Sequence, residues 1–188
     1  MEESKIVEYL KKGRIVILPT DTVYGIVADA FNLDAVDKVF KAKNRSYEKP
    51  FLILISNMDM LKKVVKKINP KEQELIKKYW PGPLTILFEK SENISDLVTS
   101  GSKYVAVRFP KNEFLCNIIN NLGNPIVAPS ANISGKPSAH KIADLEEKFK
   151  DKADLIYDGG ELFGTESTLV KVENNNIMVI RKGKIRII

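Results

Sequence analysis

A chain of 188 residues with 44% hydrophobic and 29% charged residues suits one folded domain, and this composition excludes a disordered protein. One cysteine and one histidine exclude an internal disulfide and the usual zinc sites. The net charge of +6 fits a lysine-rich solvated surface, and it also fits an anionic partner such as a nucleotide or RNA.

The sequence has no run of about 18 consecutive apolar residues, so it predicts no membrane span. The N-terminus "MEESKIVEYLKKG" is acidic first and amphipathic afterwards, so it lacks the basic start and apolar core of a signal peptide. We therefore expect a cytoplasmic protein.

Helices and strands alternate through the first third of the chain. We expect a helix over residues 4–12 that ends at Gly13, a buried strand over 14–18 and an extended segment "GIVADAF". Asn32 can cap the next helix. The residues of that helix expected to face inward are Leu33, Val36, Val39 and Phe40. The apolar run "FLILI" (51–55) predicts a strand that is buried on both faces.

The middle of the chain continues this alternation. Two helices are expected from "NMDMLKKVVKKI" and "NPKEQELIKKYW", the second with Asn69 as N-cap and Pro70 as its first residue. Strands are expected at 84–90, 104–109 and 125–128. A helix "NEFLCNIINNL" closed by Gly123 would bury Cys116 as a small apolar side chain.

The last third adds a helix, "IADLEEKFK", and the strands "DLIYDGG" and "STLVKVE". A turn "NNN" then leads to one or two final strands in "IMVIRKGKIRII". These elements predict a single α/β domain with an open, twisted, mixed sheet, whose ligands would bind in a crevice at the strand ends.

Polar residues gather where strands end, in "PTDT", "PSANISGKPS" and "GTES". The "PSANISGKPS" loop can be a turn with helix-capping serines, or it can hold a phosphate or carboxylate through neutral hydrogen bonds. It is not a P-loop, because Ser130 stands where that motif needs glycine and Pro137 follows the lysine. "GGELFG" (159–164) lacks the glycine spacing of a dinucleotide fingerprint.

Cations gather in "KAKNRSYEKP" (41–50). They can complement the dipole at the C-terminus of a helix, or they can clamp a phosphate. Arg108 and Arg181 each lie in an apolar strand, either at the surface or as carboxylate-binding groups. A capping or surface role suits His140 better than catalysis, and no nucleophile motif appears.

Seven short motifs occur in one order: "PTDTVYGIVADAF", Lys43-Asn44-Arg45, "KPFLILI", "PGPLTILF", "VAVRFP", "APSANISGKPS" and "ESTLV". Together they resemble the YrdC family over about residues 4–184, and within it the L-threonylcarbamoyladenylate synthases. The resemblance implies an open α/β domain with a twisted mixed sheet and a large, positively lined concave cleft.

The resemblance also implies an activity. Such enzymes are nucleotidyltransferases that combine L-threonine, bicarbonate or CO₂, and ATP with Mg²⁺, and they release pyrophosphate. A downstream transferase then moves the threonylcarbamoyl group to adenosine 37 of tRNA, giving t⁶A. Direct contact of tRNA or double-stranded RNA with the basic cleft is a further expectation.

The resemblance assigns roles by position. Lys43 and Arg45 are the expected catalytic cations, which would bring the anionic carbamate and ATP together. The expected threonine contacts are Thr20, Thr22, Lys49, Arg108 and Ser167. The expected nucleotide contacts are Lys43, Arg45, Ser130, Asn132, Ser138 and Arg181. Asp21 is a conceivable general base, or it organises the turn. No protein-bound metal site is expected, since Mg²⁺ would arrive with ATP.

The chain departs from the family at two points. Ser46 replaces a proline that often follows the arginine of the K-x-R motif. Some members carry an additional C-terminal domain, whereas we expect residues 1–188 to form one YrdC-like domain without it. Two other functions stay open: an RNA-binding module without catalysis, and a carbamoyl-transfer enzyme of a related branch.

Overall fold

The computed structural model describes residues 2–187. Within them, nine strands form one mixed sheet in the order β7-β1-β2-β6-β3-β5-β4-β8-β9. The strands are β1 (Val16–Pro19), β2 (Tyr24–Asp29), β3 (Leu52–Leu54), β4 (Leu84–Glu89), β5 (Tyr104–Arg108), β6 (Ile126–Val127), β7 (Leu155–Ile156), β8 (Thr168–Glu173) and β9 (Asn176–Arg181). The expected α/β fold with an open mixed sheet is thereby confirmed.

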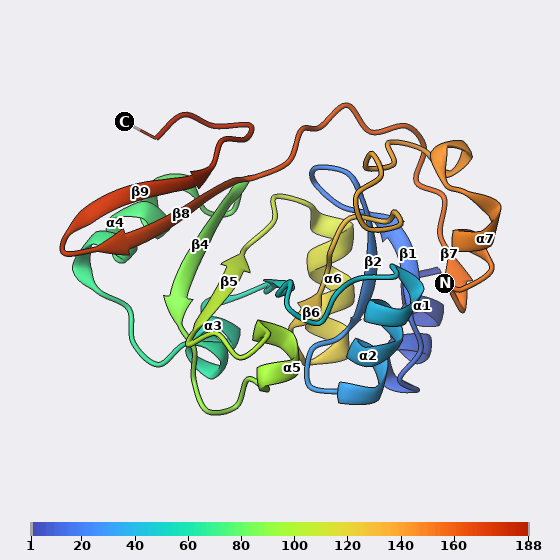
Figure 1. Cartoon of the computed structure of the whole chain (residues 1–188), viewed down its shortest axis with the longest axis horizontal. Coiled ribbons are helices and arrows are strands. Elements are labelled where there is room, and N and C mark those ends of the chain that lie inside the picture. Colours follow the sequence, from blue (N-terminus) through green and yellow to red (C-terminus); the bar gives the residue numbers. More distant parts are fainter. Residues whose placement is uncertain (1, 188) are drawn as a thin grey trace.

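The helices are α1 (Glu2–Lys11), α2 (Leu33–Ala42), α3 (Met58–Val64), α4 (Pro70–Tyr79), α5 (Asp96–Thr99), α6 (Glu113–Leu122) and α7 (Glu147–Lys150). In Figure 1, α1, α2 and α6 gather around β1 and β2, and the red β8–β9 hairpin lies at the opposite end of the molecule. The segment that joins β7 to β8 crosses between these two ends.

The sheet mixes strand directions in a way that brings distant segments together. β1 and β2 form an antiparallel hairpin, whereas β3 pairs in parallel with β5 and β4 pairs in parallel with β8. Side chains of consecutive strand residues point to opposite faces of the sheet. In β5, Val105 and Val107 are at most 1% exposed and belong to the core, while Ala106 and Arg108 face the other way.

The expected helix caps are confirmed where the sequence is clearest. Asn32 accepts a hydrogen bond from the backbone N–H of Ala35, and Asn69 forms a reciprocal capping box with Glu72. Gly123 ends α6 in the left-handed conformation, with φ of 84°. Cys116 lies on α6, but it is only half-buried.

Three local expectations were wrong. Leu33 is 45% exposed, because it opens α2 and only the following turns reach the core. The helix expected over 57–68 ends at Val64, because Val65 pairs with Lys90 in a β-bridge. The single helix expected over 142–150 is instead a 3₁₀ turn (Ile142–Asp144) and the short α7.

The turn at the start of that segment is capped by Asp144. Its carboxylate accepts hydrogen bonds from the backbone N–H groups of His140 and Lys141, at 2.9 and 3.1 Å. Such bonds stabilise the start of a helix, so the break lies after them. Leu145 is then extended, with φ of −77° and ψ of 132°, so it cannot continue a helix.

Candidate active site

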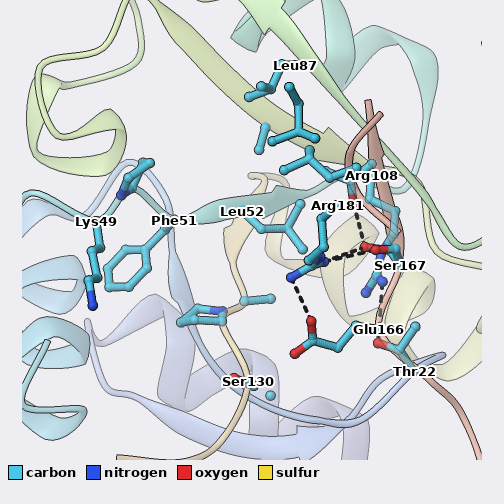
Figure 2. A pocket seen from close by; sticks show the side chains of 18 of the residues that line it. Thr22, Lys49, Phe51, Leu52, Leu87, Arg108, Ser130, Glu166, Ser167 and Arg181 are labelled. Carbon is cyan, nitrogen blue, oxygen red and sulfur yellow. Dashed lines mark hydrogen bonds and ion pairs between the residues drawn. The ribbon is translucent and has the colours of Figure 1, made fainter. Parts of the chain in front are cut away.

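A cleft of about 570 Å³ lies on the face of the sheet that Ala106 and Arg108 share. Its apolar floor comes from four neighbouring strands. The floor residues are Leu52, Leu87, Ala106 and Leu169. Its polar walls come from the loops at the strand ends, as predicted for an open α/β sheet. Figure 2 shows Lys49 and Phe51 on one side of this cleft and Thr22, Arg108 and Ser167 on the other.

The turn between β1 and β2 is fixed by the side chain of Thr20. Its hydroxyl donates to the carbonyl oxygen of Val23 at 2.7 Å and accepts from the N–H of Thr22 at 3.1 Å. The hydroxyls of Thr20 and Thr22 lie 3.1 Å apart. Gly25 leaves room behind this turn, since an added Cβ would crowd Thr20 Cγ2 at 3.1 Å. The strand therefore ends in hydroxyls that set the shape of the cleft wall.

Arg108 ends β5 and is 2% exposed, yet it lines the cleft. Its Nη1 donates to the Thr22 hydroxyl at 3.3 Å, and its Nη2 forms an ion pair with Asp21 Oδ1 at 3.0 Å. Burial lowers the pKa of the Arg108 guanidinium, the Asp21 charge opposes that shift, and the Arg181 charge adds to it. The arginine in an apolar strand is thus a buried, paired cation at the cleft wall.

Ser167 lies on the same side of the cleft as Arg108, and it contacts Arg181, the last residue of β9. Its hydroxyl lies 2.7 Å from the Thr85 hydroxyl. Arg181 donates through Nη2 to the carbonyl oxygen of Ser167 at 3.0 Å and to its hydroxyl at 3.2 Å. The same guanidinium pairs with Glu166 at 2.8 Å (Figure 2). A carboxylate therefore stands among the cations of the cleft.

Arg45 lines the cleft opposite Arg108, and its own loop holds it in place. Nε donates to the carbonyl oxygen of Lys49 and Nη2 to that of Pro50, both at 2.9 Å. The guanidinium carbon lies 5.3 Å from the centre of the Phe51 ring, a cation–π contact. Partial burial lowers the pKa of Arg45. Lys49 also lines the cleft.

Lys43 is placed differently from Arg45. It is 1% exposed and does not line the cleft. Its Nζ donates to the carbonyl oxygen of Ser130, to that of Asn132 at 2.7 Å, and to Asn132 Oδ1 at 2.8 Å. Burial, and secondarily the charge of Arg45, lowers the pKa of Lys43 to about 7. Lys43 thus holds the loop that contains Ser130 and Asn132.

That loop separates two cavities. Ser130 lines the main cleft and donates to Asn132 Oδ1 at 2.8 Å. Asn132 and Ser138 instead line a second cavity of about 290 Å³. The predicted site residues that the structure brings together in the main cleft are Thr20, Thr22, Arg45, Lys49, Arg108, Ser130, Ser167 and Arg181.

Sequence reasoning missed Thr85 and Glu166, which both line the cleft. Each had a signal: Thr85 is the polar residue in the apolar run "LTILF", and Glu166 lies inside the "GTES" cluster. His140 does not line the cleft, and its Nδ1 lies 3.0 Å from the carbonyl oxygen of Leu162.

Two carboxylates, Glu48 and Glu166, line the cleft. Across residues 2–187, no cluster of three or more His, Cys, Asp or Glu side chains is arranged as a set of metal ligands. None of the helices described over the same residues has the length and apolar character needed to cross a bilayer.

Known proteins resemble this chain closely. It is 39% identical over 176 residues to a threonylcarbamoyl-AMP synthase of Pyrococcus abyssi, an alignment covering 93% of this chain and 52% of that protein. It is 36% identical over 178 residues to a threonylcarbamoyl-AMP synthase of Bacillus subtilis, covering 94% and 51%. The chain spans about half the length of these relatives.

The fold agrees with these matches. The crystal structure of P. abyssi Sua5 complexed with L-threonine has a TM-score of 0.91 and 39% sequence identity, covering 97% of this chain and 55% of that one. The model of the family of Sua5, YciO and YrdC, described as telomere recombination, matches residues 8–183. With this match over most of its length, the chain belongs to the Sua5/YciO/YrdC family.

Proposed function

We propose that this protein is a nucleotidyltransferase that makes L-threonylcarbamoyl-AMP from L-threonine, bicarbonate or CO₂, and ATP, with release of pyrophosphate. One observation carries the proposal: a single cleft has a buried arginine and a hydroxyl at one side, Arg108 with Thr22, and a second arginine, Arg45, at the other. An amino acid and a nucleotide phosphate can therefore bind face to face.

The relatives support this proposal. Both curated relatives are named threonylcarbamoyl-AMP synthases, and the P. abyssi Sua5 structure is described as complexed with L-threonine. Because the chain spans about half of each of those proteins, their activity is an inference for this one.

The cleft chemistry suits the reaction. Threonine attacks CO₂ through its neutral amine and gives a carbamate with release of one proton to solvent. The carbamate oxygen then attacks the α-phosphate of ATP, and the bond to the leaving pyrophosphate breaks. Both partners of the second step are anions, so the step needs fixed cations that offset their repulsion and stabilise charge on the phosphate. Binding the two in line accounts for the rest of the acceleration, with no covalent enzyme intermediate.

Each side of the cleft has its own role. Arg108, Thr22 and Ser167 would receive the amino acid, because a guanidinium and hydroxyls suit a carboxylate and a hydroxyl group. Arg45 and Ser130 would receive the nucleotide, and Arg181, which donates to Ser167 on the amino-acid side, would reach the nucleotide from there. Ser138 and Asn132 would contact it from the loop and the second cavity.

For Thr20 and Lys43 we propose indirect roles in place of the direct contacts expected from the sequence. The hydroxyl of Thr20 forms its hydrogen bonds within its own turn. Thr20 would therefore shape the part of the cleft that binds the substrate threonine. Lys43 holds the Ser130–Asn132 loop, so it would act on the nucleotide through that loop. Lys49 would add a cation near the substrates.

The wider setting belongs to the same proposal. Magnesium would enter with ATP. The product would pass to a transferase that modifies tRNA at adenosine 37, and tRNA contact with the basic cleft is part of this expectation. A cytoplasmic location fits, because ATP and tRNA are supplied there.

Pyrophosphate release tests the function directly. With ATP, magnesium, bicarbonate and L-threonine, the purified protein should release pyrophosphate, and omission of either threonine or bicarbonate should abolish the release. Release that ignores both substrates would contradict the synthase. RNA binding that weakens steeply with salt, without any pyrophosphate release, would favour the RNA-binding alternative.

Arg45→Ala should lower the rate of pyrophosphate release by about tenfold or more, because a charge-assisted hydrogen bond to a phosphate contributes about 1.5–3 kcal/mol. Arg14→Ala is a matched control, since Arg14 pairs with Asp154 at 3.6 Å and does not line the cleft. Equal rates in the two variants, with unchanged thermal stability, would remove Arg45 from the phosphate site.

Lys43 should make native stability depend on pH. Its pKa is about 7 in the folded protein and about 10.4 when unfolded. Between these values the unfolded chain binds more protons, so stability rises with pH. Relative to Lys43→Met, the wild-type free energy of unfolding should increase by up to about 1.4 kcal/mol per pH unit from pH 7 to 10.

Urea unfolding at several pH values measures this difference. The exposed Lys62→Met of α3 is the control, and it should differ from wild type by less than about 0.5 kcal/mol. The prediction is wrong if the difference in free energy of unfolding between wild type and Lys43→Met stays constant with pH. That result would show that the three carbonyl acceptors keep the ammonium charged throughout.

A further inference from the structure

We propose that Asp21 is a positioning residue that holds the Arg108 guanidinium in the orientation needed to bind the carboxylate of the amino-acid substrate. This inference rests on the proposed function and refines it, because it assigns to Asp21 a part in substrate recognition instead of proton transfer.

The first argument is the burial of the pair. The Asp21 and Arg108 side chains are 6% and 3% exposed, and Oδ1 lies 3.0 Å from Nη2. Among residues 2–187, neither Asp21 oxygen accepts a hydrogen bond. The charge of this carboxylate is therefore offset chiefly by Arg108, and such a pair persists only where both partners are firmly placed.

The second argument is the direction of the pair. Arg108 lines the cleft, and Asp21 does not. A carboxylate that acts as a general base must lie within hydrogen-bond reach of its substrate. Asp21 instead contacts the cation that faces the cleft, so its effect on a substrate passes through Arg108.

The third argument is how firmly Asp21 is held. It lies between Thr20 and Thr22, in the turn that the Thr20 hydroxyl closes onto Val23. Thr22 accepts from Arg108 Nη1 at 3.3 Å. One turn thus engages two nitrogens of the same guanidinium, and it fixes both the position and the rotation of that group.

The remaining donors of Arg108 suggest what is bound. The Nε–H group is buried and has no hydrogen-bond acceptor among residues 2–187. The donors that can meet a ligand are therefore those of Nη1 and Nη2, each of which carries two hydrogens and engages one protein oxygen. Asp21 balances the guanidinium charge but leaves part of its donor capacity unused. A guanidinium in this state suits a second carboxylate, and the carboxylate that the proposed reaction supplies is that of the amino acid.

Isothermal titration with L-threonine and, separately, with ATP tests the proposal. Asp21→Asn should weaken threonine binding by about tenfold to a hundredfold, the scale that misplaced binding groups produce, and should leave ATP binding unchanged. A merely structural loss would weaken both ligands together.

Asp29→Asn is the matched control. Asp29 is also a buried carboxylate, 8% exposed, but it accepts hydrogen bonds from Phe31 N–H and Asn124 Nδ2, both at 2.9 Å, away from the cleft. This variant should bind threonine as wild type does. Wild-type threonine affinity in a folded Asp21→Asn variant would overturn the proposal.

Asp21→Glu covers the case in which Asp21→Asn fails to fold. It keeps the charge and moves the carboxylate by one methylene group, so threonine binding should still weaken. Wild-type affinity in Asp21→Glu would show that charge alone matters and would contradict positioning.

A third readout separates this proposal from the proposed function. If the wild-type protein does not bind threonine at all, the proposed function fails. NMR of the arginine side chains then decides the role of Asp21. Positioning predicts hindered rotation of the Arg108 guanidinium in the wild-type protein and free rotation in the Asp21 variants, whereas identical rotation would refute it.

Discussion

A guanidinium buried at the end of a central strand constrains how this chain folds. Arg108 ends β5, where β3 and β4 flank the strand, and a charge taken out of water there needs a partner. Asp21, which precedes β5 by three strands in chain order, supplies it. The β1–β2 turn must therefore close against β5, and this closure forms one wall of the cleft.

The same requirement for partners appears throughout the cleft. Before any ligand binds, Arg45 donates to two carbonyl groups of its own loop, and Lys43, behind the cleft, donates to three oxygens of the Ser130–Asn132 loop. The Arg45 cation is thus fixed in advance. Fixed charges suit a reaction between two anions, because the protein need not reorganise as charge develops.

Much of the architecture could be predicted from local sequence. The strand within "FLILI", the caps Asn32 and Asn69, and the polar strand ends all follow from short-range chemistry, and the structure confirms them. Burial of that strand on both faces was wrong at Leu52, which lines the cleft. Arg108 is the one charged residue in an otherwise apolar strand segment. Its residue type indicated a special environment, but its partner lies 87 positions away in sequence, so no local pattern could reveal it.

The errors and omissions have the same origin. Lys43 and Arg45 are two residues apart in one motif, yet one is buried behind a loop and the other lines the cleft. Only tertiary packing distinguishes them. The break after Asp144 lies at Leu145, whose backbone is extended, and the helical pattern of apolar residues gives no sign of it.

The central claim is that one cleft binds an amino acid at Arg108 and a nucleotide at Arg45, with the two ligands in reach of each other. The structure of the protein bound to L-threonine and a non-hydrolysable ATP analogue tests it most directly. The account predicts the threonine carboxylate on Arg108, its hydroxyl near Thr22, and the phosphates beside Arg45. Threonine bound outside this cleft, or phosphates that leave Arg45 without a ligand contact, would contradict it.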